Sequence, residues 1–151
     1  MDLMVELMSW SWRGEYSSMK RVLLVEDSEL IRTIICDALQ TCFPCVTNVV
    51  EDGSQAWEEL NRNPYDLVIT DIMMPVMDGV TLARKIREEL CSSIPIIMLT
   101  SVNKKKVRKS AYAAGATAYL TKPVDYNQLI QLVNELILPE NEQDNEAESG
   151  E

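Results

Sequence analysis

The chain has 151 residues, of which 46% are hydrophobic and 25% are charged, values typical of a single soluble globular domain. It contains no histidine, which excludes a Ser-His-Asp triad, a histidine-ligated zinc site and a phosphohistidine carried by this chain. Of the formal charge of −10, residues 139–151 contribute −6 and residues 1–18 contribute −2. The remaining −2 on residues 19–138 says little about nucleic-acid binding in either direction.

Residues 1–18 are expected to form an N-terminal extension. They lack the basic start and the long apolar core of a secretory signal peptide. Two interpretations stay open for them. Translation begins at Met19, which is slightly favoured, or the Leu, Met and Trp residues form a short amphipathic helix that docks on a partner.

From Lys20 onward, strand and helix patterns alternate. Short apolar runs predict buried strands at residues 21–27, 46–52, 66–71, 95–100 and 117–121. Apolar residues at helical spacing predict helices at residues 28–42, 53–63, 78–90, 104–115 and 125–138. The residues expected to begin or end these helices are Ser28, Ser54, Asp78, Gly115 and Asp125.

Strict alternation of strands and helices predicts an α/β fold. We expect a flavodoxin-like, doubly wound (βα)5 domain over residues 19–138, with a five-stranded parallel sheet of order 2-1-3-4-5 and helices on both faces. In such a sheet, ligands bind at the carboxyl ends of the strands, near the point where the strand order reverses. The residues that end the strands are therefore the candidate functional residues.

Acidic residues end the two strands that this order places side by side. Glu26 and Asp27 end the first strand, and Asp71 ends the third. Three carboxylates in one small pocket repel one another, so the group either takes up protons or binds a cation, and Mg²⁺ suits such oxygen ligands. With Thr100 and Lys122 from the fourth and fifth strands, the pocket could hold a phosphoryl group in transfer, with Asp71 as the nucleophile.

Four motifs in these strands resemble those of the receiver domain of two-component response regulators. They are "VLLVEDSE", "VITDIMMPVMDG", "PIIMLTS" and "AYLTKPV". The resemblance implies that Asp71 accepts phosphate and that Asp27, Asp71 and the backbone carbonyl of Met73 bind Mg²⁺, with Glu26 acting mainly through bound water. It also implies that Thr100 and Lys122 bind the phosphoryl group, and that the bond before Pro123 is cis.

The resemblance also implies partners and an output. A sensor histidine kinase or a phosphotransfer protein would donate the phosphoryl group. Thr100 would then move inward, Tyr119 would follow, and the surface of the fourth helix, fifth strand and fifth helix would change to bind a downstream protein or relay phosphate. The basic run at residues 104–109 begins that fourth helix; a solvated face is the favoured interpretation, and docking of an acidic partner is the alternative.

Other functions fit the sequence less well. A haloacid-dehalogenase-type phosphatase needs a second acid two residues after the nucleophile, where this chain has Met73. A flavin or dinucleotide binder needs a glycine-rich loop, and the first strand–helix turn here is acidic. A receiver-like docking module that works without phosphorylation is the alternative that remains, and a conventional enzyme is not expected.

Two further features are placed outside the site. Cys42 and Cys45 have the spacing of a redox or metal pair, but they follow a helix and precede a strand, so reduced structural cysteines are the favoured interpretation. Residues 139–151 are expected to be a disordered acidic tail. The protein is expected to be a stand-alone, cytoplasmic regulator with no DNA-reading element and no membrane span.

Overall fold

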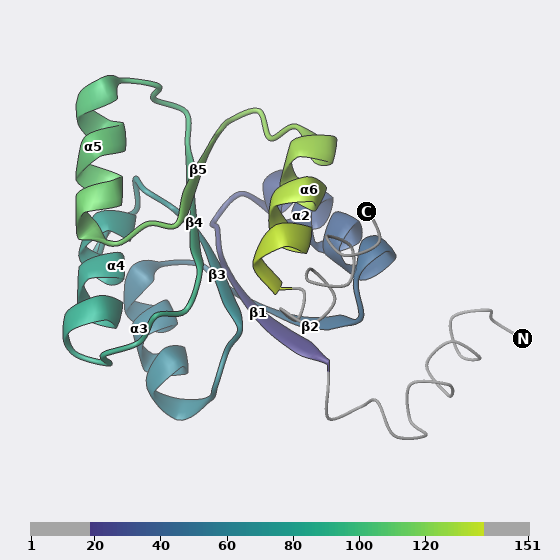
Figure 1. The fold of residues 1–151 in the computed structure, drawn as a ribbon, viewed down its shortest axis with the longest axis horizontal. Helices are drawn as coiled ribbons and strands as arrows, with labels where there is room; N and C mark the ends of the chain where they lie inside the picture. Colours follow the sequence, from purple (N-terminus) through teal and green to yellow (C-terminus); the bar gives the residue numbers. More distant parts are fainter. Residues whose placement is uncertain (1–18, 138–151) are drawn as a thin grey trace, which may run out of the picture.

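The sheet positions every element of the fold. The structure is a computed structural model that describes residues 19–137. Its parallel strands have the order β2-β1-β3-β4-β5 (Figure 1). The strands are β1 (Lys20–Val25), β2 (Cys45–Val50), β3 (Leu67–Asp71), β4 (Ile96–Thr100) and β5 (Ala118–Thr121). The helices are α2 (Glu29–Cys42), α3 (Gly53–Arg62), α4 (Gly79–Glu88), α5 (Lys105–Ala114) and α6 (Tyr126–Ile137). The expected fold is confirmed.

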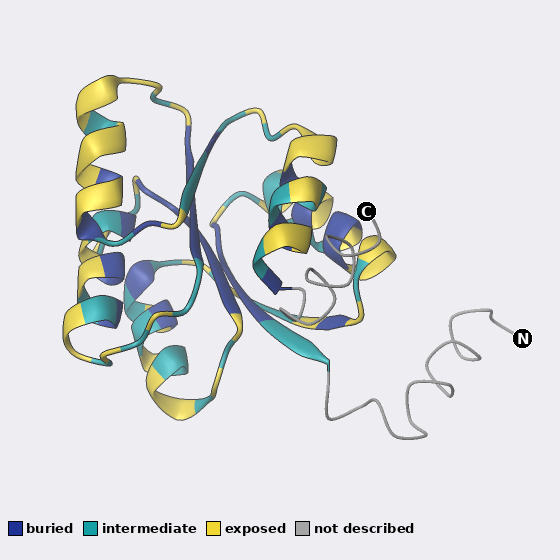
Figure 2. Ribbon diagram, viewed as in Figure 1, coloured by how far each residue is buried: buried dark blue, intermediate teal, exposed yellow. Residues whose placement is uncertain are grey.

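Helices cover both faces of the sheet, because side chains alternate between the faces along each strand. Leu24 of β1 packs in the cluster that contains Leu39 of α2 and Val133 of α6. Leu23, its neighbour, packs in the cluster that contains Leu82 of α4 together with residues of α3 and α5. The central strands β1, β3 and β4 are consequently buried between two helical layers, whose outer surfaces are exposed (Figure 2).

Helix ends mostly follow the expected residues. Ser28, Asp78 and Asp125 each accept a hydrogen bond from a backbone N–H in the first turn of α2, α4 and α6. Gly115 ends α5 with a left-handed φ of 115°. The expectation for α3 was wrong, because Asp52 rather than Ser54 caps this helix, its carboxylate accepting from Gln55 N at 2.8 Å.

Lys104, the residue directly before α5, makes no capping hydrogen bond with its side chain. A Lys104→Asp variant is expected to raise the free energy of unfolding by about 1 kcal/mol. The new carboxylate would accept a hydrogen bond from a free backbone N–H of the first turn, and its negative charge would interact favourably with the positive end of the helix dipole. Urea denaturation measures the change. Lys109→Asp changes the charge equally without capping the helix, and an equal gain from both variants would contradict the capping argument.

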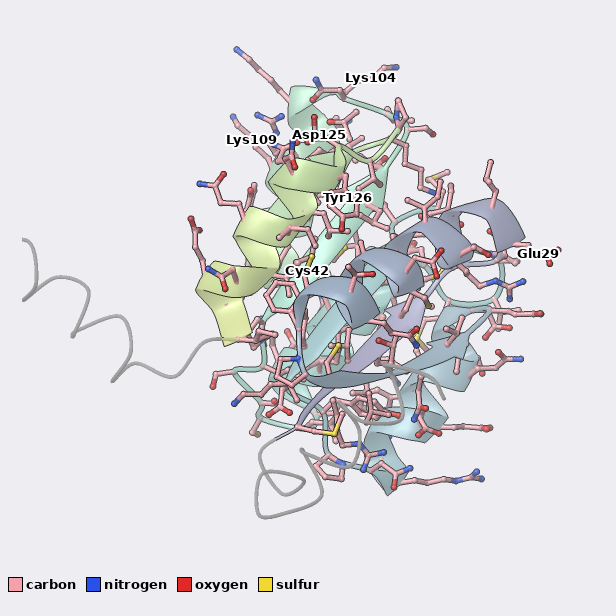
Figure 3. The ribbon with its side chains drawn as sticks, turned by 90° about the vertical axis from the view of Figure 1, so that its right-hand side faces the viewer. Glu29, Cys42, Lys104, Lys109, Asp125 and Tyr126 are labelled. Atoms are coloured by element: carbon pink, nitrogen blue, oxygen red, sulfur yellow. The ribbon has the colours of Figure 1, made fainter. Side chains whose placement is uncertain are left out.

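The cysteine pair occupies the positions expected for it. Cys42 ends α2 and Cys45 begins β2, and all four cysteines of the chain are free thiols. Cys42 Sγ lies 3.4 Å from the hydroxyl oxygen of Tyr126 at the start of α6 (Figure 3). Burial raises the pKa of the Cys45 thiol, so it stays protonated at neutral pH. A purely structural role for the pair remains a prediction.

Two expected segments lie outside the described residues. These are the N-terminal extension, residues 1–18, and the acidic tail, residues 139–151. The boundaries proposed at residues 19 and 138 therefore stay predictions. Within residues 19–137, no helix has both the length and the apolar character needed to cross a bilayer.

Candidate functional site

The strand ends are held in place by backbone hydrogen bonds that continue the sheet past its last residues. Glu26 N donates to Val50 O at 3.0 Å, and Ile72 N, directly after Asp71, donates to Leu99 O at 3.0 Å. Lys122 N donates to Thr100 O at 2.7 Å. The Lys122–Pro123 bond is cis, as the resemblance implied. These bonds bring the ends of β1, β3, β4 and β5 to one edge of the sheet.

Four of the expected site residues meet at this edge. Carboxylate oxygens of Glu26, Asp27 and Asp71 lie within 4.8 Å of one another. The ammonium of Lys122 lies 2.5 Å from Asp71 Oδ1 and 3.1 Å from Glu26 Oε2. The backbone N–H of Ser28, which the sequence did not assign to the site, donates to Glu26 Oε1 at 3.1 Å. Glu26 and Asp71 are buried, whereas Asp27 is exposed.

The buried carboxylate of Asp71 is hard to ionise. Burial, together with the neighbouring Glu26 carboxylate, raises the pKa of Asp71 to about 7, against the opposing effect of Lys122. Burial would lower the pKa of Lys122, but its contacts with Asp71 and Glu26 outweigh burial and raise it. The ammonium therefore stays charged, and it contacts two of the three carboxyl groups of the cluster.

This donor set fits a hard divalent cation. Oε2 of Glu26 and Oδ1 of Asp71 are buried and accept no hydrogen bond of good geometry, although Lys122 lies at ion-pair distance from both. Three carboxylates beside one ammonium leave an excess of negative charge. Carboxylate oxygens with access to water on one side, here at Asp27, are the ligands that Mg²⁺ prefers.

Thr100 and Tyr119 meet at the backbone of Val102. Val102 N donates to Thr100 Oγ1 at 3.1 Å, and Thr100 Oγ1 lies 3.4 Å from Val102 O. The Tyr119 hydroxyl donates to the same Val102 carbonyl at 2.6 Å. The two residues expected to switch therefore share one backbone partner, and in this structure the Thr100 hydroxyl is bonded to Val102.

The loop between β3 and α4 packs closely on the backbone of Asp71. Gly79 N donates to Ile72 O at 2.8 Å, and a Cβ atom at Gly79 would lie 2.3 Å from the Asp71 carbonyl oxygen. The sequence predicted Asp78 as the residue that begins this helix, but it did not predict the contact of Gly79 with Asp71. Met73, two residues after Asp71, has a side chain that is 75% exposed.

Val76, in the same loop, is strained. Its φ is 69°, and Met77 N donates to Pro75 O at 2.8 Å around it, which makes a γ-turn. Positive φ is costly for a β-branched residue. Because glycine adopts this φ freely, Val76→Gly is expected to raise the free energy of unfolding by about 0.5–1 kcal/mol. This net value includes the stability lost because glycine makes the unfolded chain more flexible. Val76→Ala, which keeps Cβ, should gain less in chemical denaturation; an equal gain would argue against backbone strain.

Known proteins have sequences similar to that of this chain. The chain is 34% identical over 118 residues to the chemotaxis protein CheY of Halobacterium salinarum, covering 78% of this chain and 97% of that protein. It is 39% identical over 122 residues to the sensor histidine kinase TmoS of Ectopseudomonas mendocina, covering 80% of this chain. The chain spans only 12% of that kinase's length.

Solved structures share its fold. The chemotaxis response regulator CheY4 of Vibrio cholerae has a TM-score of 0.72 at 30% identity, covering 80% of this chain and 99% of that chain. The receiver domain of the sensor histidine kinase PA1611 of Pseudomonas aeruginosa, solved with a magnesium ion coordinated in its active site cleft, has a TM-score of 0.71 at 32% identity, covering 79% and 98%.

A family model also matches most of the chain. The model of the response regulator receiver domain matches residues 22–134. This range contains β1 from Val22 onward, the other four strands and the whole acidic cluster. The strand order and the position of the cluster at the carboxyl edge of the sheet agree with this match. The chain therefore belongs to the response regulator receiver domain family, a family of signalling domains rather than of conventional enzymes.

Proposed function

We propose that this protein is a phosphate-accepting response regulator, in which Asp71 receives a phosphoryl group from the phosphohistidine of a sensor histidine kinase or a phosphotransfer protein. The observation that carries the proposal is the contact of the Lys122 ammonium with Asp71 and Glu26, beside Asp27. This arrangement combines a nucleophilic carboxylate with a fixed positive charge at the edge of the sheet where such chemistry occurs.

Three side chains have different roles in phosphoryl transfer. A carboxylate oxygen of Asp71 forms the new bond to phosphorus, while the bond from phosphorus to the donor imidazole nitrogen breaks and its electron pair stays on that nitrogen. The ammonium of Lys122 moves from the carboxylates towards the phosphoryl oxygens, whose charge it stabilises. The Thr100 hydroxyl leaves Val102 and donates to another of these oxygens.

The acidic cluster fits Mg²⁺ as the cofactor. Asp27, Asp71 and the backbone carbonyl of Met73 would hold the ion, with Glu26 acting mainly through bound water. When bound, Mg²⁺ supplies positive charge that offsets the repulsion between carboxylates and phosphoryl oxygens.

Incubation of the protein with acetyl phosphate and Mg²⁺ tests the proposal directly. Intact-mass spectrometry is expected to show the addition of one phosphoryl group, and peptide mapping is expected to place it on Asp71. A chain that stays unmodified with acetyl phosphate, and that shows no NMR shifts with beryllofluoride, would favour the alternative of a docking module that works without phosphorylation.

Removal of the cation or of its ligands is expected to stop the reaction. Chelation by EDTA should abolish labelling, and Asp27→Asn should weaken Mg²⁺ affinity by about 10-fold or more, since a charged ligand becomes neutral. Titration of backbone NMR signals with Mg²⁺ measures the affinity. Asp52→Asn is the matched control, because asparagine still caps α3 at the neighbouring strand end. Equal weakening in both variants would show a general charge effect.

The output surface follows from the position of the Thr100–Val102–Tyr119 contacts. When Thr100 turns towards the phosphoryl group, Val102 loses one of its two side-chain partners, and Tyr119 is free to move with it. Thr100 ends β4, Val102 precedes α5 and Tyr119 belongs to β5. We therefore propose that the surface of α5, β5 and α6 changes and binds a downstream protein or relays phosphate.

A further inference from the structure

The exposed side of α5 carries a dense group of cations, called the basic face below. Its members are exposed and come from one helix and the residue before it: Lys104, Lys105, Lys106, Arg108 and Lys109. From Ser101 to Val124 the chain has no acidic residue. Figure 3 shows Lys104 and Lys109 at the same end of the molecule as Asp125, the residue that caps the start of α6.

The lysines of this face are unpaired within the described chain. The ion pairs of residues 19–137 involve Arg32, Lys85 and Lys122, and none involves a lysine of the basic face. Like charges at spacings of three and four residues repel one another on a helix. They are also disfavoured near the positive end of the helix dipole. The basic face therefore carries a local cost in stability that an anionic partner would relieve.

Arg108 connects the basic face to the residues of the switch. Its guanidinium carbon lies 5.2 Å from the centre of the Tyr119 ring, and Nη2 donates to Asn103 Oδ1 at 3.1 Å. The Tyr119 hydroxyl in turn donates to Val102, which also holds Thr100. A continuous series of contacts thus joins an exposed cation to the hydroxyl of Thr100, the last residue of β4.

We propose that the basic face binds an acidic segment of a partner protein, and that Arg108 couples this binding to phosphorylation of Asp71. The proposal rests on the proposed function for the state of Asp71, but the binding of acidic groups to α5 stands independently of it. Arg108 acts as a positioning residue, because it touches Tyr119 rather than the reacting atoms.

The direction of the coupling follows from the contacts. Stacking of Arg108 on Tyr119 holds the ring where its hydroxyl binds Val102, and this arrangement keeps Thr100 bonded to Val102. A carboxylate that pairs with Arg108 competes with the ring for the guanidinium and so releases Tyr119 and Thr100. Phosphorylation, which pulls Thr100 away, frees Arg108 in return. The two events favour each other equally, since coupling between binding sites is reciprocal.

The position of the face favours a partner segment over the chain's own acidic tail. Helix α5 begins at the carboxyl edge of the sheet, where its lysines lie, whereas α6 ends at the opposite edge with Ile137 (Figure 1). Ile137, the last described residue before the acidic residues 139–151, thus lies at the end of the molecule away from the lysines. A long nucleic acid is disfavoured because the acidic cluster lies at the same edge as the basic face.

An NMR titration tests the binding. The full-length, ¹⁵N-labelled protein is titrated with an acetylated hexaglutamate amide, with and without beryllofluoride and Mg²⁺. Signals of α5 are expected to shift in both conditions, and beryllofluoride is expected to raise the affinity about fivefold. Absence of shifts on α5 would overturn the binding proposal.

Two matched variants test the coupling. Lys109→Gln removes one charge and leaves the Tyr119 contact intact, so it should weaken binding but keep the enhancement by beryllofluoride. Arg108→Gln removes the same charge together with the ring contact, so it should weaken binding and lose the enhancement. An equal enhancement in both variants would overturn the role of Arg108. The NMR shifts that beryllofluoride causes at Asp71 are measured separately. Their absence in the parent protein would reject the proposed function. The titration without beryllofluoride would still show whether α5 binds acidic groups.

Other occupants give distinct results. Changing the six acids of residues 139–151 to amides should leave the affinity for hexaglutamate unchanged. A gain of about fivefold would mean that the tail competes for the face, and it would overturn the choice of a partner segment. Hexathymidylate should bind no tighter than hexaglutamate; tighter binding at the same signals would replace the acidic protein segment by a nucleic acid.

Discussion

An Asp71→Asn variant is expected to take up no phosphoryl group from acetyl phosphate in the presence of Mg²⁺. Asparagine keeps the volume of the side chain but replaces the nucleophilic carboxylate oxygen by an amide, which forms no acyl phosphate. The Lys122 ammonium retains Glu26 as a partner at 3.1 Å, so the site should not collapse. Intact-mass spectrometry after incubation measures the loss, and circular dichroism checks that the variant is folded.

Asp78→Asn is the matched control for this experiment. Asp78 lies at the end of the same loop and caps α4 through Thr81 N at 2.7 Å, a role that asparagine also fills. This variant should be labelled at the rate of the parent. Labelling of Asp71→Asn at the parental rate would remove Asp71 from its assigned role.

An Arg87→Ala variant is expected to lose about 3 kcal/mol of unfolding free energy. Arg87 joins three backbone carbonyls of two segments: Nε and Nη2 donate to Gly115 O at 3.1 and 2.7 Å, and Nη1 donates to Ser92 O at 2.9 Å and Ile94 O at 2.6 Å. Hydrogen bonds from charged donors are worth more than neutral ones, and truncation leaves partly buried carbonyls without partners. Urea denaturation measures the loss.

Lysine cannot replace Arg87, which gives this prediction a second test. Arg87→Lys keeps the charge but replaces a planar fork of donors by one ammonium, so most of the stability should still be lost. Arg84→Ala, an exposed arginine on the same helix, should change stability by about 0.5 kcal/mol or less. If Arg87→Lys were as stable as the parent, charge rather than the fork would explain the role of Arg87.

The parts of the fold that the sequence predicted are those with a local signal. Each strand is a short apolar run, and the caps Ser28, Asp78 and Asp125 stand immediately before helical patterns. The start of α3 was wrong because two good capping residues, Asp52 and Ser54, lie two positions apart. Asp52 caps the helix because its carboxylate accepts a hydrogen bond from Gln55 N. Whether the carboxylate can make this bond depends on the path of the chain after β2.

Periodicity also does not say how much of a helix its neighbours cover. Leu30 and Ile34 continue the apolar stripe of α2, yet their exposed fractions are 71% and 44%. Ile35 and Leu39 are fully buried by the sheet and α6. Which apolar residues of a helix belong to the core depends on packing between elements far apart in sequence.

The acidic cluster was predictable because each member ends a strand, and the strand order alone brings Glu26, Asp27 and Asp71 together. Contacts made through the backbone could not be predicted in this way, because they leave no pattern of residue types in the sequence. Gly79 against the Asp71 carbonyl, Ser28 N on Glu26 and Arg87 on three carbonyls depend on main-chain positions rather than on complementary side chains.

The peptide group of Val102 shows what such main-chain roles mean for mutagenesis. Its N–H and its C=O both serve switch residues, Thr100 and Tyr119, whereas its side chain serves neither. Scanning this position with alanine, leucine or glutamate would therefore report tolerance, although the position joins the two residues. Proline, which removes the N–H, would be the substitution that exposes the role. The backbone of a residue can thus be required for the switch even when substitutions of its side chain have no measurable effect.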